Sequence, residues 1–146
     1  MKKNILVSAC LLGEPTRYDG KSKPCEAVIS LREKYNLIPV CPEVLGGLPT
    51  PRTPSERVGD RVIMRDGCDV TENFRLGAER ALGIYRENNC EFAVIKARSP
   101  SCGKGEIYDG SFSGRLTEGE GVFAEMLGDA GVEIFSEEEI ERLLTK

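Results

Sequence analysis

Apolar residues along the chain gather in short runs of the length of buried β-strands, separated by longer stretches in which they recur at helical spacing. The run at residues 91–96 is apolar enough for the centre of a sheet. Strands are predicted at residues 4–8, 37–40, 91–96 and 132–135, with a small extra strand within 60–65.

Three stretches between these runs show the periodicity of amphipathic helices. In the first, Pro24 suits an opening turn and Tyr35 lies on the apolar stripe. Ser136, followed three residues later by Glu139, forms a capping box that predicts a last helix. The three helices are expected at residues 24–35, 71–87 and 118–130.

Strands that alternate with helices indicate a mostly parallel sheet joined by right-handed crossovers. We therefore expect an α/β fold, a single three-layer Rossmann-like domain over residues 1–146 with about four main strands. The first and third strands are expected to be neighbours at the centre of the sheet. The Pro- and Gly-rich residues 42–54 are predicted to form no regular element, and residues 99–113 a loop.

The formal net charge of -4 and pI of about 5.1 argue against a protein whose main role is to grip a nucleic-acid backbone. Basic residues nevertheless gather near the cysteine-bearing loops, so the site is expected to be locally positive. They are Arg17, Lys21, Lys23, Arg52, Arg57, Lys96, Arg98 and Lys104.

The chain shows neither a signal-peptide pattern nor an apolar run of membrane-spanning length, and we expect a cytoplasmic protein without a membrane partner. Disulfides are not expected in a reducing cytosol, so the 6 cysteines need another role. There is no histidine, which removes the commonest general base and the commonest zinc ligand.

Cys10, Cys41 and Cys102 each follow a predicted strand, in segments rich in loop-forming residues. Ligands of open α/β sheets bind beyond the carboxyl ends of the strands, so these thiols are expected to meet at a shared metal or redox site. No Cys-x-x-Cys pair exists to build a closed zinc site. Three separated thiolates fit a [4Fe-4S] cluster with one iron left without a protein ligand.

The other three cysteines, Cys25, Cys68 and Cys90, are predicted to be small buried apolar residues. Glu43, two residues after Cys41, is the best candidate for a catalytic acid or base, with pairing to Arg52 as the structural alternative.

Two serines of the Cys102 segment, Ser99 and Ser101, are further catalytic candidates. They can donate protons or hydrogen bonds to substrate or to sulfur, or can merely form the turn at Pro100. Lys96 is interpreted either as an anion contact or as a solvated strand end.

Several longer motifs make the chain resemble a bacterial family of domains of unknown function that includes thiouracil desulfidase. The resemblance covers nearly the whole chain. The matching stretches are residues 7–13, 17–20, 39–43, 46–52, 67 with 69–71, 96 with 98–103, and 107–110.

This resemblance implies a [4Fe-4S] cluster held by Cys10, Cys41 and Cys102, and a substrate sulfur that binds the open iron to give a transient sulfide-loaded cluster. It also implies that Glu43 and either Ser99 or Ser101 move protons. The expected enzyme removes sulfur from a small thiolated molecule, a thiouracil-like nucleobase or related thioamide. The alternatives are another sulfur-handling enzyme on the same cluster and a non-enzymatic iron–sulfur or redox-sensing module.

Overall fold

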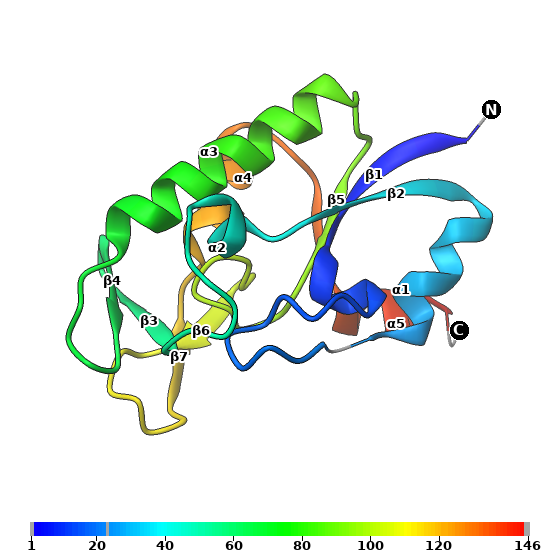
Figure 1. The fold of residues 1–146 in the computed structure, drawn as a ribbon. Coiled ribbons are helices and arrows are strands. Elements are labelled where there is room, and N and C mark those ends of the chain that lie inside the picture. Colours follow the sequence, from blue (N-terminus) through cyan, green and yellow to red (C-terminus); the bar gives the residue numbers. More distant parts are fainter. Residues whose placement is uncertain (1, 23, 145–146) are drawn as a thin grey trace.

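The computed structural model describes residues 2–22 and 24–144, with a four-stranded parallel sheet at the centre (Figure 1). Its strands are β1 (Lys3–Ser8), β2 (Tyr35–Val40), β5 (Ala93–Ile95) and β8 (Ile134–Ser136), in the order β2-β1-β5-β8. Every pairing between neighbours is parallel. The predicted parallel α/β sheet is confirmed, with the first and third predicted strands at its centre.

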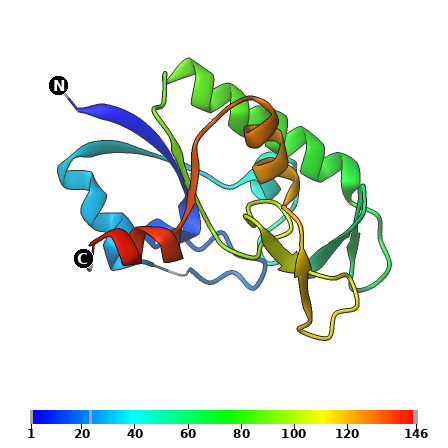
Figure 2. The ribbon, with the colours of Figure 1, turned by 180° about the vertical axis from the view of Figure 1, so that it is seen from behind.

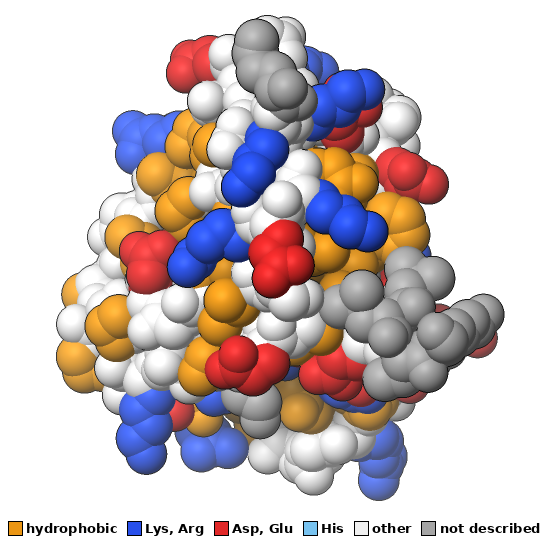
Figure 3. All heavy atoms as spheres, turned by 90° about the vertical axis from the view of Figure 1, so that its right-hand side faces the viewer, with side chains coloured by type: hydrophobic (Ala, Val, Ile, Leu, Met, Phe, Trp, Pro, Cys, Tyr) orange, Lys and Arg blue, Asp and Glu red, His pale blue; other side chains and the backbone are white. Residues whose placement is uncertain are grey.

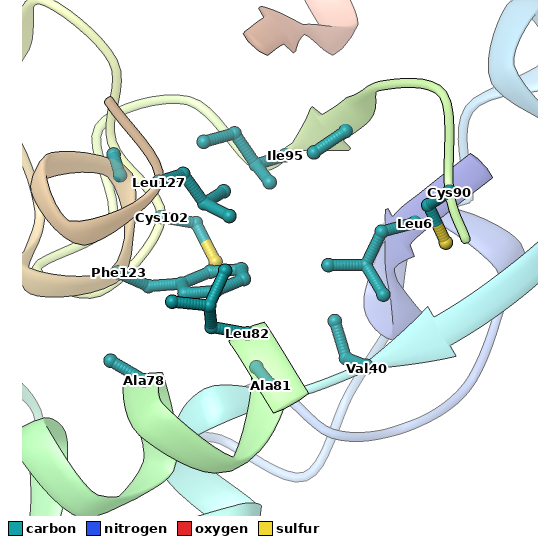
Figure 4. Packing of buried hydrophobic residues seen from close by; sticks show 12 residues of the cluster. Leu6, Val40, Ala78, Ala81, Leu82, Cys90, Ile95, Cys102, Phe123 and Leu127 are labelled. Atoms are coloured by element: carbon teal, nitrogen blue, oxygen red, sulfur yellow. The ribbon is translucent and has the colours of Figure 1, made fainter. Parts of the chain in front are cut away.

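Helices cover both faces of the sheet, which gives three layers (Figures 1 and 2). On one face Leu6 and Ile95 contribute to an apolar cluster with residues of α3 (Thr71–Glu87) and α4 (Val122–Asp129), drawn in Figure 4. On the other, Ile5, Val7 and Val94 pack with α1 (Glu26–Ile29) and α5 (Glu137–Leu144). Alternate residues of a strand point to opposite faces, so central strands buried on both sides are continuously apolar.

The predicted helix over residues 24–35 is shorter than expected. It forms α1 and a 3-10 turn, η2 (Ser30–Glu33), whereas Tyr35 opens strand β2. Tyr35 pairs with Lys3 of β1, and its ring meets that of Phe92 edge to face at 5.2 Å between centroids. These contacts with distant residues outweigh the local helical spacing.

Residues 42–54 were predicted to lack regular structure, and this is wrong for α2 (Pro42–Leu45). Proline suits the first helical position because its missing N–H would have no partner there. The short helix lies against α3 at two glycines: a Cβ on Gly46 would overlap the Asn73 carbonyl group, and a Cβ on Gly77 would overlap that of Pro42. Tertiary packing therefore holds a helix too short to be stable alone.

Two antiparallel hairpins extend from the sheet domain at the end opposite α1 and α5 (Figures 1 and 2). The first pairs β3 (Ser55–Val58) with β4 (Arg61–Met64), of which only β4 was predicted. The second pairs β6 (Glu106–Tyr108) with β7 (Leu116–Glu118), in a segment predicted to be loop and helix start.

The predicted capping box is present. The Ser136 amide donates to the Glu139 carboxylate at 3.1 Å, and the Glu139 amide donates to Ser136 Oγ at 3.4 Å.

On the face at the right of Figure 1, Lys and Arg side chains are interspersed with Asp and Glu side chains (Figure 3). Among the described residues, no helix is both long and apolar enough to cross a membrane.

Candidate functional site

Three cysteines from distant parts of the chain line one cavity at the carboxyl edge of the sheet. Cys10 lies in the 3-10 turn η1 (Ala9–Leu12) after β1, Cys41 lies between β2 and α2, and Cys102 lies in the loop after β5. The cavity has a volume of about 710 Å³. Cys10 packs with the apolar cluster on the α1 and α5 side, and Cys102 with the cluster on the α3 side (Figure 4). The thiols thus flank the end of the central strands.

Burial favours the neutral, protonated form of these thiols. It raises the pKa of Cys10 to about 11 and that of Cys102 to about 12, and it also raises the pKa of the half-buried Cys41. Cys41 raises the pKa of Cys10 further, and Cys41 and Cys10 together raise that of Cys102, because neighbouring thiolates would repel. A positively charged group bound between the thiols would supply the compensation that they need to ionise.

The three thiols border the same cavity. Among the described residues, no group of three or more Cys, Asp or Glu side chains is arranged to hold a single metal ion. Thiolates that bind an iron–sulfur cluster attach to different irons, so they need not share one ligand centre. Three thiols on one cavity are a donor set that an iron–sulfur cluster accepts.

Glu43, on α2, forms hydrogen bonds with two side chains of the cavity wall. Its Oε1 accepts from Arg52 Nε at 3.0 Å, and its Oε2 accepts from Ser101 Oγ at 3.3 Å. Arg52 is only 3% exposed and also donates to the Thr16 carbonyl at 2.9 Å. The ion pair that the sequence offered as an alternative role is present, and it leaves Glu43 in contact with Ser101.

The two serines of the Cys102 loop have different surroundings. Ser99 Oγ accepts the amides of Ser101 and Cys102, both at 3.1 Å, and so shapes the turn. Ser101 Oγ is buried and lies 3.0 Å from Ser99 Oγ, 3.3 Å from Glu43 and 3.6 Å from Cys102 Sγ. Ser101 is therefore the serine that connects the carboxylate to the sulfur.

Sequence reasoning missed Ser8, which ends β1 and is buried. Its Oγ accepts the Lys96 amide at 2.9 Å and donates to Cys102 Sγ at 3.4 Å. No local pattern distinguishes this serine from an ordinary strand residue.

Lys96 is not a solvated strand end, because it pairs with the Glu137 carboxylate at 3.0 Å.

The cavity wall is rich in cations. It includes Arg17, Arg52, Arg65, Lys96 and Arg98, against the carboxylates Glu43 and Glu56. Lys21, Arg57 and Lys104 are not part of this lining, and Lys23 lies outside the described residues.

All 6 cysteines are among the described residues, and none forms a disulfide. Cys25 and Cys90 are buried in the apolar clusters as expected. The expectation of burial is wrong for Cys68, which is exposed. It lies in a turn where its amide donates to the Asp66 carboxylate, away from any apolar cluster.

Comparison with known proteins assigns the chain to a family. The profile of the 2-thiouracil desulfurase family matches residues 5–139. The chain belongs to this family. The matched range contains the three cavity cysteines together with Glu43 and Ser101.

Two proteins match this member of the 2-thiouracil desulfurase family over nearly their whole lengths. The chain is 39% identical to the uncharacterized protein YbbK of Bacillus subtilis (strain 168), over 96% of the chain and 99% of that protein. A solved structure described as [4Fe-4S]-dependent thiouracil desulfidase TudS is 46% identical, with a TM-score of 0.90 over 99% of this chain and 97% of the other.

Proposed function

We propose that the protein is a [4Fe-4S]-dependent desulfidase that removes sulfur from a thiouracil-like nucleobase or a related thioamide. The observation that carries this proposal is the meeting of three strand-end thiols with the Glu43–Ser101 hydrogen bond on one cavity. The family match and the similarity to TudS support it. The reduced cysteines suit a reducing compartment, which supports a cytoplasmic location.

Cys10, Cys41 and Cys102 would hold the cluster. When bound through three thiolates, the cluster supplies an iron with a position open to the substrate sulfur, where it acts as a Lewis acid. Ser8 Oγ donates a hydrogen bond to Cys102 Sγ and so orients one ligand, while the single proton of Ser101 Oγ is donated to the Glu43 carboxylate. The cavity lining provides room for a substrate beside the thiols.

The net reaction exchanges the substrate sulfur for the oxygen of water. A carbon–oxygen bond forms, the carbon–sulfur bond breaks, and the two protons of water leave with sulfide as H₂S. Glu43 Oε2 would accept a proton from the attacking water, while Arg52 holds the carboxylate through Oε1. Ser101 Oγ, 3.3 Å from that carboxylate, would pass a proton toward the departing sulfur, and Ser99 would position Ser101.

Anaerobic reconstitution followed by a sulfide-release assay on 2-thiouracil tests the activity. Glu43→Gln keeps nearly the same size but removes the proton acceptor, so turnover is expected to fall by about 10²–10⁴-fold. Iron content and the visible spectrum should not change, because Glu43 is not a proposed ligand. A fully active Glu43→Gln variant would exclude Glu43 as the base. A cluster-loaded wild type that releases no sulfide would instead favour a redox-sensing module.

The ligand assignment has its own test in iron content. The variants Cys10→Ser, Cys41→Ser and Cys102→Ser should each sharply lower the amount of iron bound after reconstitution, because one thiolate is lost. The matched control is Cys68→Ala, since Cys68 is an exposed cysteine outside the cavity lining. Equal iron loss in the control, or full iron in a Cys102→Ser variant, would contradict the assignment.

A further inference from the structure

One phenylalanine of the chain does not belong to the protein core. Phe74 and Phe123 are fully buried, while Phe92 and Phe135 meet edge to face and pack against the cluster beside α1 and α5. Phe112 belongs to none of the apolar clusters formed by the described residues. It is half-buried in the loop between β6 and β7 and lines the cavity that contains the three cysteines. An aromatic ring in this place has a cavity rather than a core to pack against.

The loop that carries Phe112 is held by a single carboxylate of the other hairpin. Glu56 Oε1, from β3, accepts the Gly110 amide at 2.8 Å and the Phe112 amide at 3.1 Å. Gly110 lies so close to β3 that a Cβ there would overlap the Val58 side chain. Phe112 has a φ of 55°, a left-handed conformation that a bulky residue rarely adopts. The two hydrogen bonds to Glu56 offset this strain and define where the ring lies.

A cation fixes the ring further. The Arg65 guanidinium lies over the Phe112 ring, 5.5 Å from its centroid, within the range of a cation–π contact. Arg65 and Glu56 themselves line the cavity, as do the half-exposed rings of Tyr18 and Tyr108. Planar heterocycles bind to such aromatic walls by stacking, and the contact is insensitive to the ring substituents.

We propose that Phe112 is the aromatic wall on which the substrate ring stacks, and that Glu56 is a positioning residue that holds this wall in place. The inference rests on the proposed function and adds to it the residues that select a planar heterocycle. It distinguishes two parts of the cavity: the thiols with Glu43 and Ser101 carry the chemistry, and the two hairpins carry the binding of the ring.

Phe112→Leu tests the wall, because leucine is apolar but has no aromatic face. With 2-thiouracil, KM is expected to rise about 5- to 150-fold, the range of a lost base–aromatic stack, while kcat changes by less than about threefold. The matched control is Ser113→Ala, in the same loop but exposed and outside the cavity lining. An unchanged KM in Phe112→Leu would overturn the proposal, as would an equal rise in the control.

Glu56 is tested by a pair of variants. Glu56→Ala releases the Gly110 and Phe112 amides and should raise KM as much as Phe112→Leu does. Glu56→Gln retains a carbonyl oxygen that accepts both amides and should restore KM to within about twofold of wild type. A role in stability alone would not produce this rescue in KM with kcat preserved. Equal KM values in Glu56→Ala and wild type would exclude the positioning role.

An equilibrium measurement separates failure of this inference from failure of the proposed reaction. The Kd of 2-thiouracil is measured anaerobically by calorimetry in cluster-loaded Glu43→Gln protein, with and without Phe112→Leu. Weaker binding upon loss of the ring supports the wall even if no turnover occurs. Sulfide release with a Kd that is insensitive to Phe112 overturns the wall and leaves the desulfidase intact. A protein that neither binds nor converts 2-thiouracil overturns both.

Discussion

The close approach of α2 to α3 makes Gly77 the most informative position for linking packing to the site. Gly77→Ala adds a methyl group that would overlap the backbone carbonyl of Pro42. Backbone atoms cannot rotate away as a side chain does, so α2 must move, and Cys41 and Glu43 move with it. Overpacking costs roughly 1–3 kcal/mol. Alanine regains about 1 kcal/mol of helix propensity relative to glycine, which leaves a net loss of about 2 kcal/mol at the upper end.

Gly83 provides the matched control on the same helix, because a Cβ there would meet nothing within 4 Å. Gly83→Ala should stabilise the protein by up to about 1 kcal/mol through helix propensity. Circular dichroism of the two apo variants should show Tm lower by up to roughly 4–8 °C for Gly77→Ala and higher by up to roughly 2–4 °C for Gly83→Ala.

Iron content after anaerobic reconstitution gives the second measurement. Gly77→Ala should bind less iron than wild type, because Cys41 precedes the displaced helix directly. Gly83→Ala should bind as much iron as wild type. The reasoning is refuted if both alanines raise Tm equally and both proteins bind iron like wild type, since α2 would then yield without strain.

Two further predictions follow from the environment of individual side chains. Ser8→Ala removes a hydrogen bond to Cys102 Sγ and should make the reduction potential of the reconstituted cluster more negative, because a donor to sulfur stabilises the reduced state. An EPR-monitored redox titration measures the potential. An unchanged potential would exclude this role of Ser8. In the apo protein, a thiol reagent such as DTNB should modify the exposed Cys68 first and the buried Cys102 last, because Cys102 is the least accessible of the six and its pKa is raised by burial to about 12. Peptide mapping measures the order, and modification of Cys102 before the other buried cysteines would contradict it.

Local patterns sufficed for the elements whose stability is largely local or whose burial is complete. The 17-residue helix α3 was predicted with its observed ends, because its apolar stripe is long enough to be unambiguous. The capping box at Ser136 was recognised because both partners lie within one turn. The strand-end positions of the three cysteines followed from the same logic, since apolar runs define where the strands of a parallel sheet end.

Tertiary structure alone decided the short elements and the working contacts of the site. The α2 turn exists because two glycines allow close packing against α3, and the hairpin strands that were not predicted, β3, β6 and β7, are only 3 or 4 residues long, too short for their patterns to be distinctive. Ser8 and Cys102 are 94 residues apart, and Glu56 and Phe112 are 56 apart, so no local pattern links them. Hydrophobic periodicity reports which face of an element is buried, whereas the partner of a hydrogen bond depends on how distant segments fold together.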